Sequence, residues 1–193
     1  MLSFIIIGSG YRAEFYIRVA NENKDKLNLL GVLVRNKEKF NYLKDKYNIN
    51  VSLNEDELLN LKPDFIVVCV DKLHILDTSL YYANLGYPIL METPAALNLL
   101  DINKFKCAIN SGLKIQVAEQ YIRMPYISSV INEVNSNIIG EVTNLELSYA
   151  HEYHAISIAR EILKGKVKSV IGKTYNNQIV KTCDRYNTYY SGK

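Results

Sequence analysis

A glycine-rich segment near the N-terminus carries the clearest chemical signal in this 193-residue chain. It follows an apolar run and has the pattern Gly-x-Gly-x-x-Ala. Its residues are Gly8, Ser9, Gly10, Tyr11, Arg12 and Ala13. In this pattern the first glycine permits a tight turn, the second lets a pyrophosphate approach the backbone, and the small third residue lets helix and strand pack closely. Free amides at the start of the next helix favour an anion. We therefore expect a dinucleotide site, whereas a turn that serves only packing is the alternative.

The end of the second expected strand, over residues 27–34, predicts which dinucleotide binds. An acid at this point bonds the ribose 2′-hydroxyl of NAD, while an arginine accommodates the 2′-phosphate of NADP. Here the strand runs into Arg35 and Asn36, and no acid is present. The sequence therefore favours NADP over NAD. The alternative is that Arg35 is an ordinary surface arginine.

Three further positions follow apolar, strand-like runs, where open α/β sheets bind ligands. His74 lies after the run over 64–70, and it could contact the cofactor or cap a helix. Glu92 and Pro94 follow the run over 88–91, and both could be structural.

A pair of histidines, His151 and His154, is spaced so that a helix would place both on one side. Histidine titrates near neutral pH and can act as a general base. Two such ligands without a third are too few for a metal ion, so no metal site is expected. The alternative is that these polar residues cap the helix and line the edge of a cleft.

Apolar runs alternate with helical patterns up to about residue 120. Because the runs are apolar on both faces, they predict an α/β fold, a doubly wound parallel Rossmann sheet covered on both sides. Asn54 and Glu57 have the spacing of a capping box at one helix start. The expected strands are 3–7, 27–34, 64–70, 88–91 and 114–118. The expected helices are 11–21, 37–47, 54–61, 73–85 and 97–109.

The pattern changes after residue 120, which predicts two domains, an NAD(P)-binding domain over 1–120 and a partial C-terminal α+β domain over 121–193. Two strands rarely make a stable sheet alone. Either this part packs on the first domain, or a partner chain completes it, or the chain is a fragment. The expected helices here are 126–137 and 153–163, and the expected antiparallel strands are 142–149 and 167–181.

Several of these segments together resemble the Gfo/Idh/MocA oxidoreductases. The matching residues are 8–13, Arg35, 64–74, 91–94, 117–123, 139–142 and 154–160. The resemblance implies hydride transfer between a nicotinamide and a hydroxyl or carbonyl of a sugar-like or polyol substrate. It also implies cofactor contacts at His74, Glu92, Thr93 and Pro94, with a peptide before Pro94 that is often cis.

The same resemblance reveals departures from the family pattern. The usual catalytic lysine falls at Thr93 and the usual aspartate at Ala150, which leaves His154 as the expected catalytic residue. The resemblance therefore implies an NAD(P)-dependent oxidoreductase acting on CH–OH groups. The alternative is a non-catalytic nucleotide-binding or sensor protein, degenerate or truncated.

Composition excludes several other classes of protein. The formal net charge is +3, and lysines and acids are interspersed, so no nucleic-acid partner is expected. No run approaches the ~18 apolar residues of a membrane span, and the apolar N-terminus lacks a basic leader. The 3 cysteines are far apart, which suits the reducing cytoplasm. The expected partner is a small molecule, and the C-terminal sheet could form a homo-oligomer interface.

Overall fold

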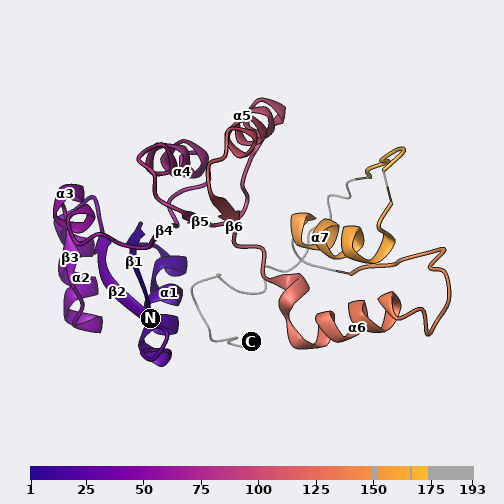
Figure 1. Ribbon diagram of the computed structural model, residues 1–193, viewed down its shortest axis with the longest axis horizontal. Coiled ribbons are helices and arrows are strands. Elements are labelled where there is room, and N and C mark those ends of the chain that lie inside the picture. Colours follow the sequence, from indigo (N-terminus) through magenta and orange to yellow (C-terminus); the bar gives the residue numbers. More distant parts are fainter. Residues whose placement is uncertain (149–151, 166, 174–193) are drawn as a thin grey trace, which may run out of the picture.

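A computed structural model describes residues 1–148, 152–165 and 167–173. Its centre is a six-stranded sheet with the order β3-β2-β1-β4-β5-β6, and every pair of neighbours is parallel (Figure 1). The predicted α/β Rossmann fold is therefore confirmed. The strands are β1 (Leu2–Ile7), β2 (Leu27–Leu33), β3 (Val51–Ser52), β4 (Phe65–Val68), β5 (Ile89–Met91) and β6 (Ile115–Val117).

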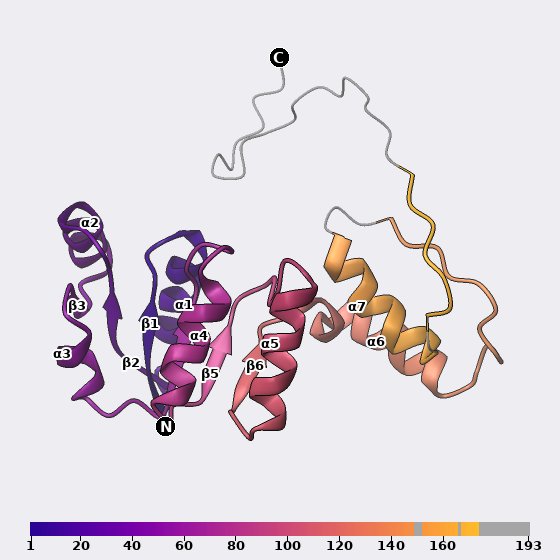
Figure 2. The ribbon, with the colours of Figure 1, turned by 90° about the horizontal axis from the view of Figure 1, so that it is seen from above.

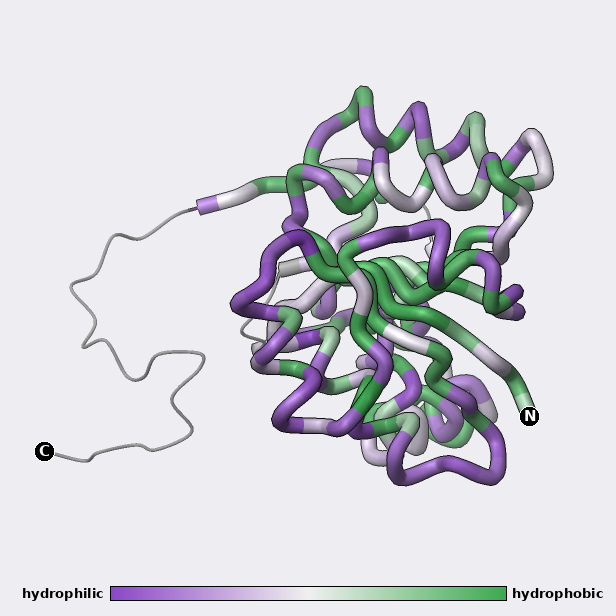
Figure 3. Tube along the Cα trace, turned by 90° about the vertical axis from the view of Figure 1, so that its left-hand side faces the viewer, coloured by the Kyte–Doolittle hydropathy of each residue, from purple (hydrophilic) through white to green (hydrophobic). Residues whose placement is uncertain are grey.

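The sheet is apolar on both faces because each strand sends alternate side chains to opposite sides. In β1, Phe4 and Ile6 belong to one core cluster while Ile5 and Ile7 belong to the other. The first cluster includes residues of α1 and α2, and the second includes residues of α3, α4 and α5. Figure 3 shows the apolar strands crossing the middle of this domain. The helices are α1 (Tyr11–Glu22), α2 (Lys37–Tyr47), α3 (Glu55–Leu59), α4 (Ile75–Asn84) and α5 (Leu99–Asn110).

The start of α3 differs in one detail from the expected capping box. Asn54 is the N-cap, and its side chain accepts from the Asp56 amide at 3.0 Å. Glu57 does not return to the Asn54 amide but accepts from the Ser52 hydroxyl at 2.6 Å, and that hydroxyl oxygen accepts the Asn54 N–H at 2.9 Å. Ser52 lies in β3, a strand of only two residues, which is too short for its sequence to show a period. The sequence therefore did not indicate that Ser52 takes part in this cap.

Beyond β6 the chain forms a separate helical unit at the edge of the sheet. A short 3₁₀ helix, η1 (Tyr121–Arg123), leads into α6 (Pro125–Asn135), and α7 (Glu152–Leu163) packs beside α6 (Figure 2). The two helices share a small apolar core of their own. Its buried members are Ile127, Ile131, Ile158 and Ile162.

The strand predicted over 142–149 is wrong for 142–148, where the described chain has no regular secondary structure. Val142, Leu145 and Leu147 instead pack against the core of α6 and α7. No strand forms because a strand needs a hydrogen-bonded partner, and the described residues supply none here. The alternating apolar residues are instead partly buried against the two helices.

The second predicted strand is also missing where it can be seen, since residues 167–173 have no regular structure. Residues 174–181 of the same prediction lie outside the described chain. The predicted antiparallel sheet is therefore not formed by residues 142–148 and 167–173. The homo-oligomer interface that was expected on it and the domain division at residue 120 stay predictions. Within the described ranges no helix is long and apolar enough to cross a membrane.

Candidate functional site

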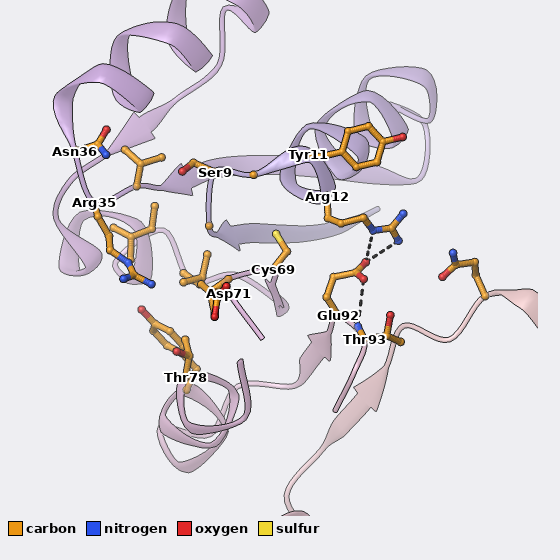
Figure 4. Close-up of a pocket in the computed structure, with 18 of the residues that line it drawn as sticks. Ser9, Tyr11, Arg12, Arg35, Asn36, Cys69, Asp71, Thr78, Glu92 and Thr93 are labelled. Carbon is orange, nitrogen blue, oxygen red and sulfur yellow. Dashed lines mark hydrogen bonds and ion pairs between the residues drawn. The ribbon is translucent and has the colours of Figure 1, made fainter. Parts of the chain in front are cut away.

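A cleft of about 1010 Å³ opens at the carboxyl ends of the strands. In open α/β sheets, ligands bind at this edge where the strand order reverses, which here is between β1 and β4. The loops after β1, β2, β4 and β5 all contribute to its lining, as Figure 4 shows. Residues from the start of η1 and from α7 complete it. They are Gln120, Tyr121, Tyr153 and His154.

Glycine occupies two positions of the turn after β1 for different structural reasons. Gly8 has φ +126°, and a Cβ there would lie 2.4 Å from the carbonyl oxygen of Cys69, so only glycine fits. Gly10 has φ −85°, and a Cβ there would meet no heavy atom within 4 Å. Gly10 also stands at the N-cap of α1 and offers no capping side chain. This open space at a helix N-terminus fits the pyrophosphate of a dinucleotide.

Arg12 and Glu92, both expected to contact the cofactor, are bound to each other (Figure 4). The Oε1 atom of Glu92 lies 2.8 Å from Nε and 2.6 Å from Nη2 of Arg12, and it accepts the Tyr16 hydroxyl at 2.7 Å. Its Oε2 atom accepts the Thr93 amide at 3.2 Å. Glu92 thus joins the first helix to the loop after β5. The arrangement orders the floor of the cleft.

Burial and neighbouring charges set the protonation states of the side chains in this cluster. Burial lowers the pKa of Arg12, but the carboxylate of Glu92 outweighs it and raises the pKa overall, so the guanidinium stays charged. Burial and the same carboxylate raise the pKa of Tyr16, which keeps its hydroxyl a donor. Burial also raises the pKa of the Cys69 thiol beside them.

Arg35 and Asn36 line the far part of the cleft, after β2. The Asn36 side chain accepts from the Lys39 amide at 2.9 Å and so caps α2. The Arg35 side chain is exposed, with Thr78 and Tyr82 of α4 in the lining of the same cleft. The position after β2 is therefore cationic, as the sequence predicts.

His154 lies at the other end of the lining, on the first turn of α7, and is only 5% exposed. Its Nδ1 atom lies 2.6 Å from Oε2 of Glu119. A carboxylate only accepts hydrogen bonds, so Nδ1 is the donor. The imidazole also stacks on the ring of Tyr121, with centroids 4.0 Å apart. The histidine is thus held by groups from the crossing after β6.

Most of the predicted site residues meet in this one cleft. Those that line it are Gly8, Ser9, Gly10, Tyr11, Arg12, Arg35, Glu92, Thr93 and His154. Ala13 is fully buried beneath the turn, as close helix–strand packing requires. The Thr93–Pro94 peptide is cis, but Pro94 is outside the lining.

His74 occupies the N-cap position of α4, and it is exposed and outside the lining. Its predicted contact with a cofactor remains a prediction. His151 lies outside the described residues, so its predicted pairing with His154 stays a prediction.

Reasoning from the sequence missed several residues that shape the site. Glu119 and Tyr121 follow the carboxyl end of β6, and Asp71 follows that of β4, so the position after each strand could have identified them. No sequence signal would have identified Tyr16, which reaches Glu92 from one turn into α1 across 76 positions.

Residues 2–119 match the family described as "Oxidoreductase family, NAD-binding Rossmann fold". The fold is similar to that of scyllo-inositol dehydrogenase from Lactobacillus casei with bound cofactor NAD(H) and scyllo-inositol. The TM-score is 0.72 at 14% identity, over 85% of this chain and 56% of that one. It is also similar to the WlbA dehydrogenase from Bordetella pertussis in complex with NADH and UDP-GlcNAcA. That TM-score is 0.64 at 17% identity, over 72% and 43% of the two chains.

A sequence relative, an alpha-N-acetylgalactosaminidase from Bacteroides fragilis, is 26% identical over 130 residues. The match covers 67% of this chain and 30% of that protein. The chain therefore spans less than two thirds of the length of each of these three proteins. At these identities the structural likenesses show the fold.

Proposed function

Because the chain belongs to the Gfo/Idh/MocA oxidoreductase family, with its NAD-binding Rossmann fold, we propose that it is a dehydrogenase that prefers NADP. Its substrate is a sugar-like molecule or cyclic polyol with a reactive hydroxyl or carbonyl. One observation carries the proposal, namely that the glycine turn, Arg35, Thr93 and His154 all line a single cleft.

Different residues along this cleft bind different parts of the dinucleotide. The turn at Gly8 and Gly10 holds the pyrophosphate at the N-terminus of α1. Arg35 pairs with the 2′-phosphate, which is why NADP is preferred, although the two similar dehydrogenases named above hold NAD(H) or NADH. A bound nicotinamide supplies or accepts a hydride at its C4 atom.

Oxidising an alcohol also releases the hydroxyl proton, and a side chain must hold it. Three of the lining side chains are unsuited, because Arg12 stays charged, Glu92 is engaged by donors from three residues and burial raises the pKa of the Cys69 thiol. Among the lining residues within the described ranges there is no lysine. His154 can take and return a proton, so we assign it this role.

The substrate class rests on chemistry that the relatives' names share. Scyllo-inositol, UDP-GlcNAcA and an N-acetylgalactosaminide each contain a ring that carries hydroxyl groups. A cleft lined by charged, amide and hydroxyl side chains suits such a ring.

A second candidate is a nucleotide-binding protein without redox activity. The lysine-free lining of the described cleft favours it, since the family's usual proton carrier falls at Thr93.

Fluorescence titration with NADPH and NADH, followed by turnover on a panel of sugars and polyols, tests both candidates. We expect tighter binding of NADPH and reduction or oxidation of at least one panel member. Binding without any turnover would favour the second candidate. If the protein binds neither NADPH nor NADH, both candidate functions are refuted.

A further inference from the structure

Glu119 and His154 connect two parts of the molecule that are far apart in sequence. Glu119 follows β6 of the sheet, whereas His154 stands on α7 of the helical unit, 35 positions later. Their side chains are 19% and 7% exposed, so the contact is largely removed from water. A partly buried carboxylate interacts with an imidazole more strongly than an exposed one does.

The carboxylate of Glu119 is itself held in place by the backbone. Its Oε1 atom accepts the Tyr121 amide at 2.9 Å, while Oε2 meets His154 Nδ1 at 2.6 Å. Both oxygens are therefore used, and the direction of the carboxylate follows from the turn that begins η1. A glutamate with only one contact would keep more freedom of rotation.

Aromatic rings hold the imidazole against this carboxylate. The Tyr121 ring stacks on it at 18° between planes, and the Tyr153 ring lies tilted with centroids 4.4 Å apart. Tyr121 thus acts twice, through its amide on Glu119 and through its ring on His154. Glu119 is not among the residues that line the cleft, whereas His154, Tyr121 and Tyr153 are.

We propose that Glu119 is a positioning residue for His154. Its carboxylate keeps the hydrogen of the neutral imidazole on Nδ1, so that Nε2 is the nitrogen that takes the proton of the substrate hydroxyl. When Nε2 takes that proton, the negative charge of Glu119 stabilises the imidazolium that forms. On substrate reduction the same proton returns from Nε2 to the new alkoxide oxygen. The inference rests on the proposed function for its consequence, but the tautomer is a property of the protein alone.

The test compares Glu119→Ala and Glu119→Gln with Glu161→Gln, a control at an exposed glutamate on the same helix as His154. Long-range ¹H–¹⁵N NMR spectra of the full chain report which nitrogen of His154 carries hydrogen in the neutral form. We expect the Nδ1–H form in the parent and in Glu161→Gln. We expect Glu119→Ala to lose this preference and Glu119→Gln to show a mixture, because an amide can either accept from Nδ1 or donate to it.

NADPH binding, measured on the same samples, separates this inference from the proposed function. All variants should bind NADPH like the parent, since Glu119 does not line the cleft. If the parent protein does not bind NADPH, the proposed function is refuted, whereas the tautomer result stands. An Nε2–H form in the parent, or a tautomer unchanged in both Glu119 variants, would overturn the positioning role. Should the alanine variant fail to fold, the nearly isosteric glutamine variant decides.

Discussion

Replacing Gly10 with valine should separate nucleotide binding from folding. The backbone at Gly10 has φ −85° and ψ −174°, an extended conformation that any residue adopts. A Cβ there would meet no heavy atom of the protein within 4 Å. The added side chain therefore occupies only the space that we assign to the pyrophosphate, and we expect Gly10→Val to fold but to bind NADPH much more weakly.

The magnitude follows from the contacts that the pyrophosphate would lose. A hydrogen bond to a charged group contributes about 1.5–3 kcal/mol. Displacing one or two of them costs about 3 kcal/mol, which is roughly a 100-fold weaker Kd at ~1.4 kcal/mol per tenfold change. Valine is a poorer N-cap than glycine, by roughly 1 kcal/mol. For a chain of this size that lowers Tm by about 2–4 °C.

Gly8→Ala is the control, because it adds a methyl group in the same turn but is expected to destabilise the fold. Its Cβ would lie 2.4 Å from the Cys69 carbonyl oxygen at a φ of +126°. Such strain costs about 1–3 kcal/mol or more and should appear as a larger loss of Tm. The assays are thermal unfolding and fluorescence titration with NADPH. If Gly10→Val binds NADPH like the parent, the cofactor does not lie against this turn and the reasoning is refuted.

Other changes in the cleft should have distinct signatures. Arg35→Asp should weaken NADPH by about 1.5–3 kcal/mol more than NADH in parallel titrations, and equal losses would contradict the NADP preference. His154→Ala should slow single-turnover hydride transfer by about 10²–10⁴-fold with NADPH affinity unchanged. Thr93→Ala should be milder, and the assignment is wrong if it is the inactive variant. Because burial raises the pKa of Cys69, mass spectrometry should find it alkylated far more slowly than exposed Cys107.

The sequence predicted those features that depend on neighbouring residues. The glycine turn stands between a strand and a helix, α2 begins at Lys37 and ends at Tyr47 as expected, and β1 is apolar at every buried position. Each of these rests on local backbone geometry or on the period of a strand. Such constraints act within a few residues, so a single sequence shows them.

The sequence failed where a structure depends on a distant partner. The alternation over 142–149 predicted a strand, but the described part of it packs on helices instead. A strand is stable only when another strand accepts its hydrogen bonds, and periodicity says nothing of that partner.

The arrangement of the site itself was decided by tertiary structure. Arg12 and Glu92 were expected to contact the cofactor separately, yet 80 positions apart they form one ion pair. Glu119 meets His154 only because the chain crosses from β6 into the helical unit that returns α7 to the cleft. Local sequence specifies which residues can donate, accept or carry a proton. Which of them come within 3 Å depends on how the sheet, the helices and the crossing pack, and that packing is a property of the whole chain.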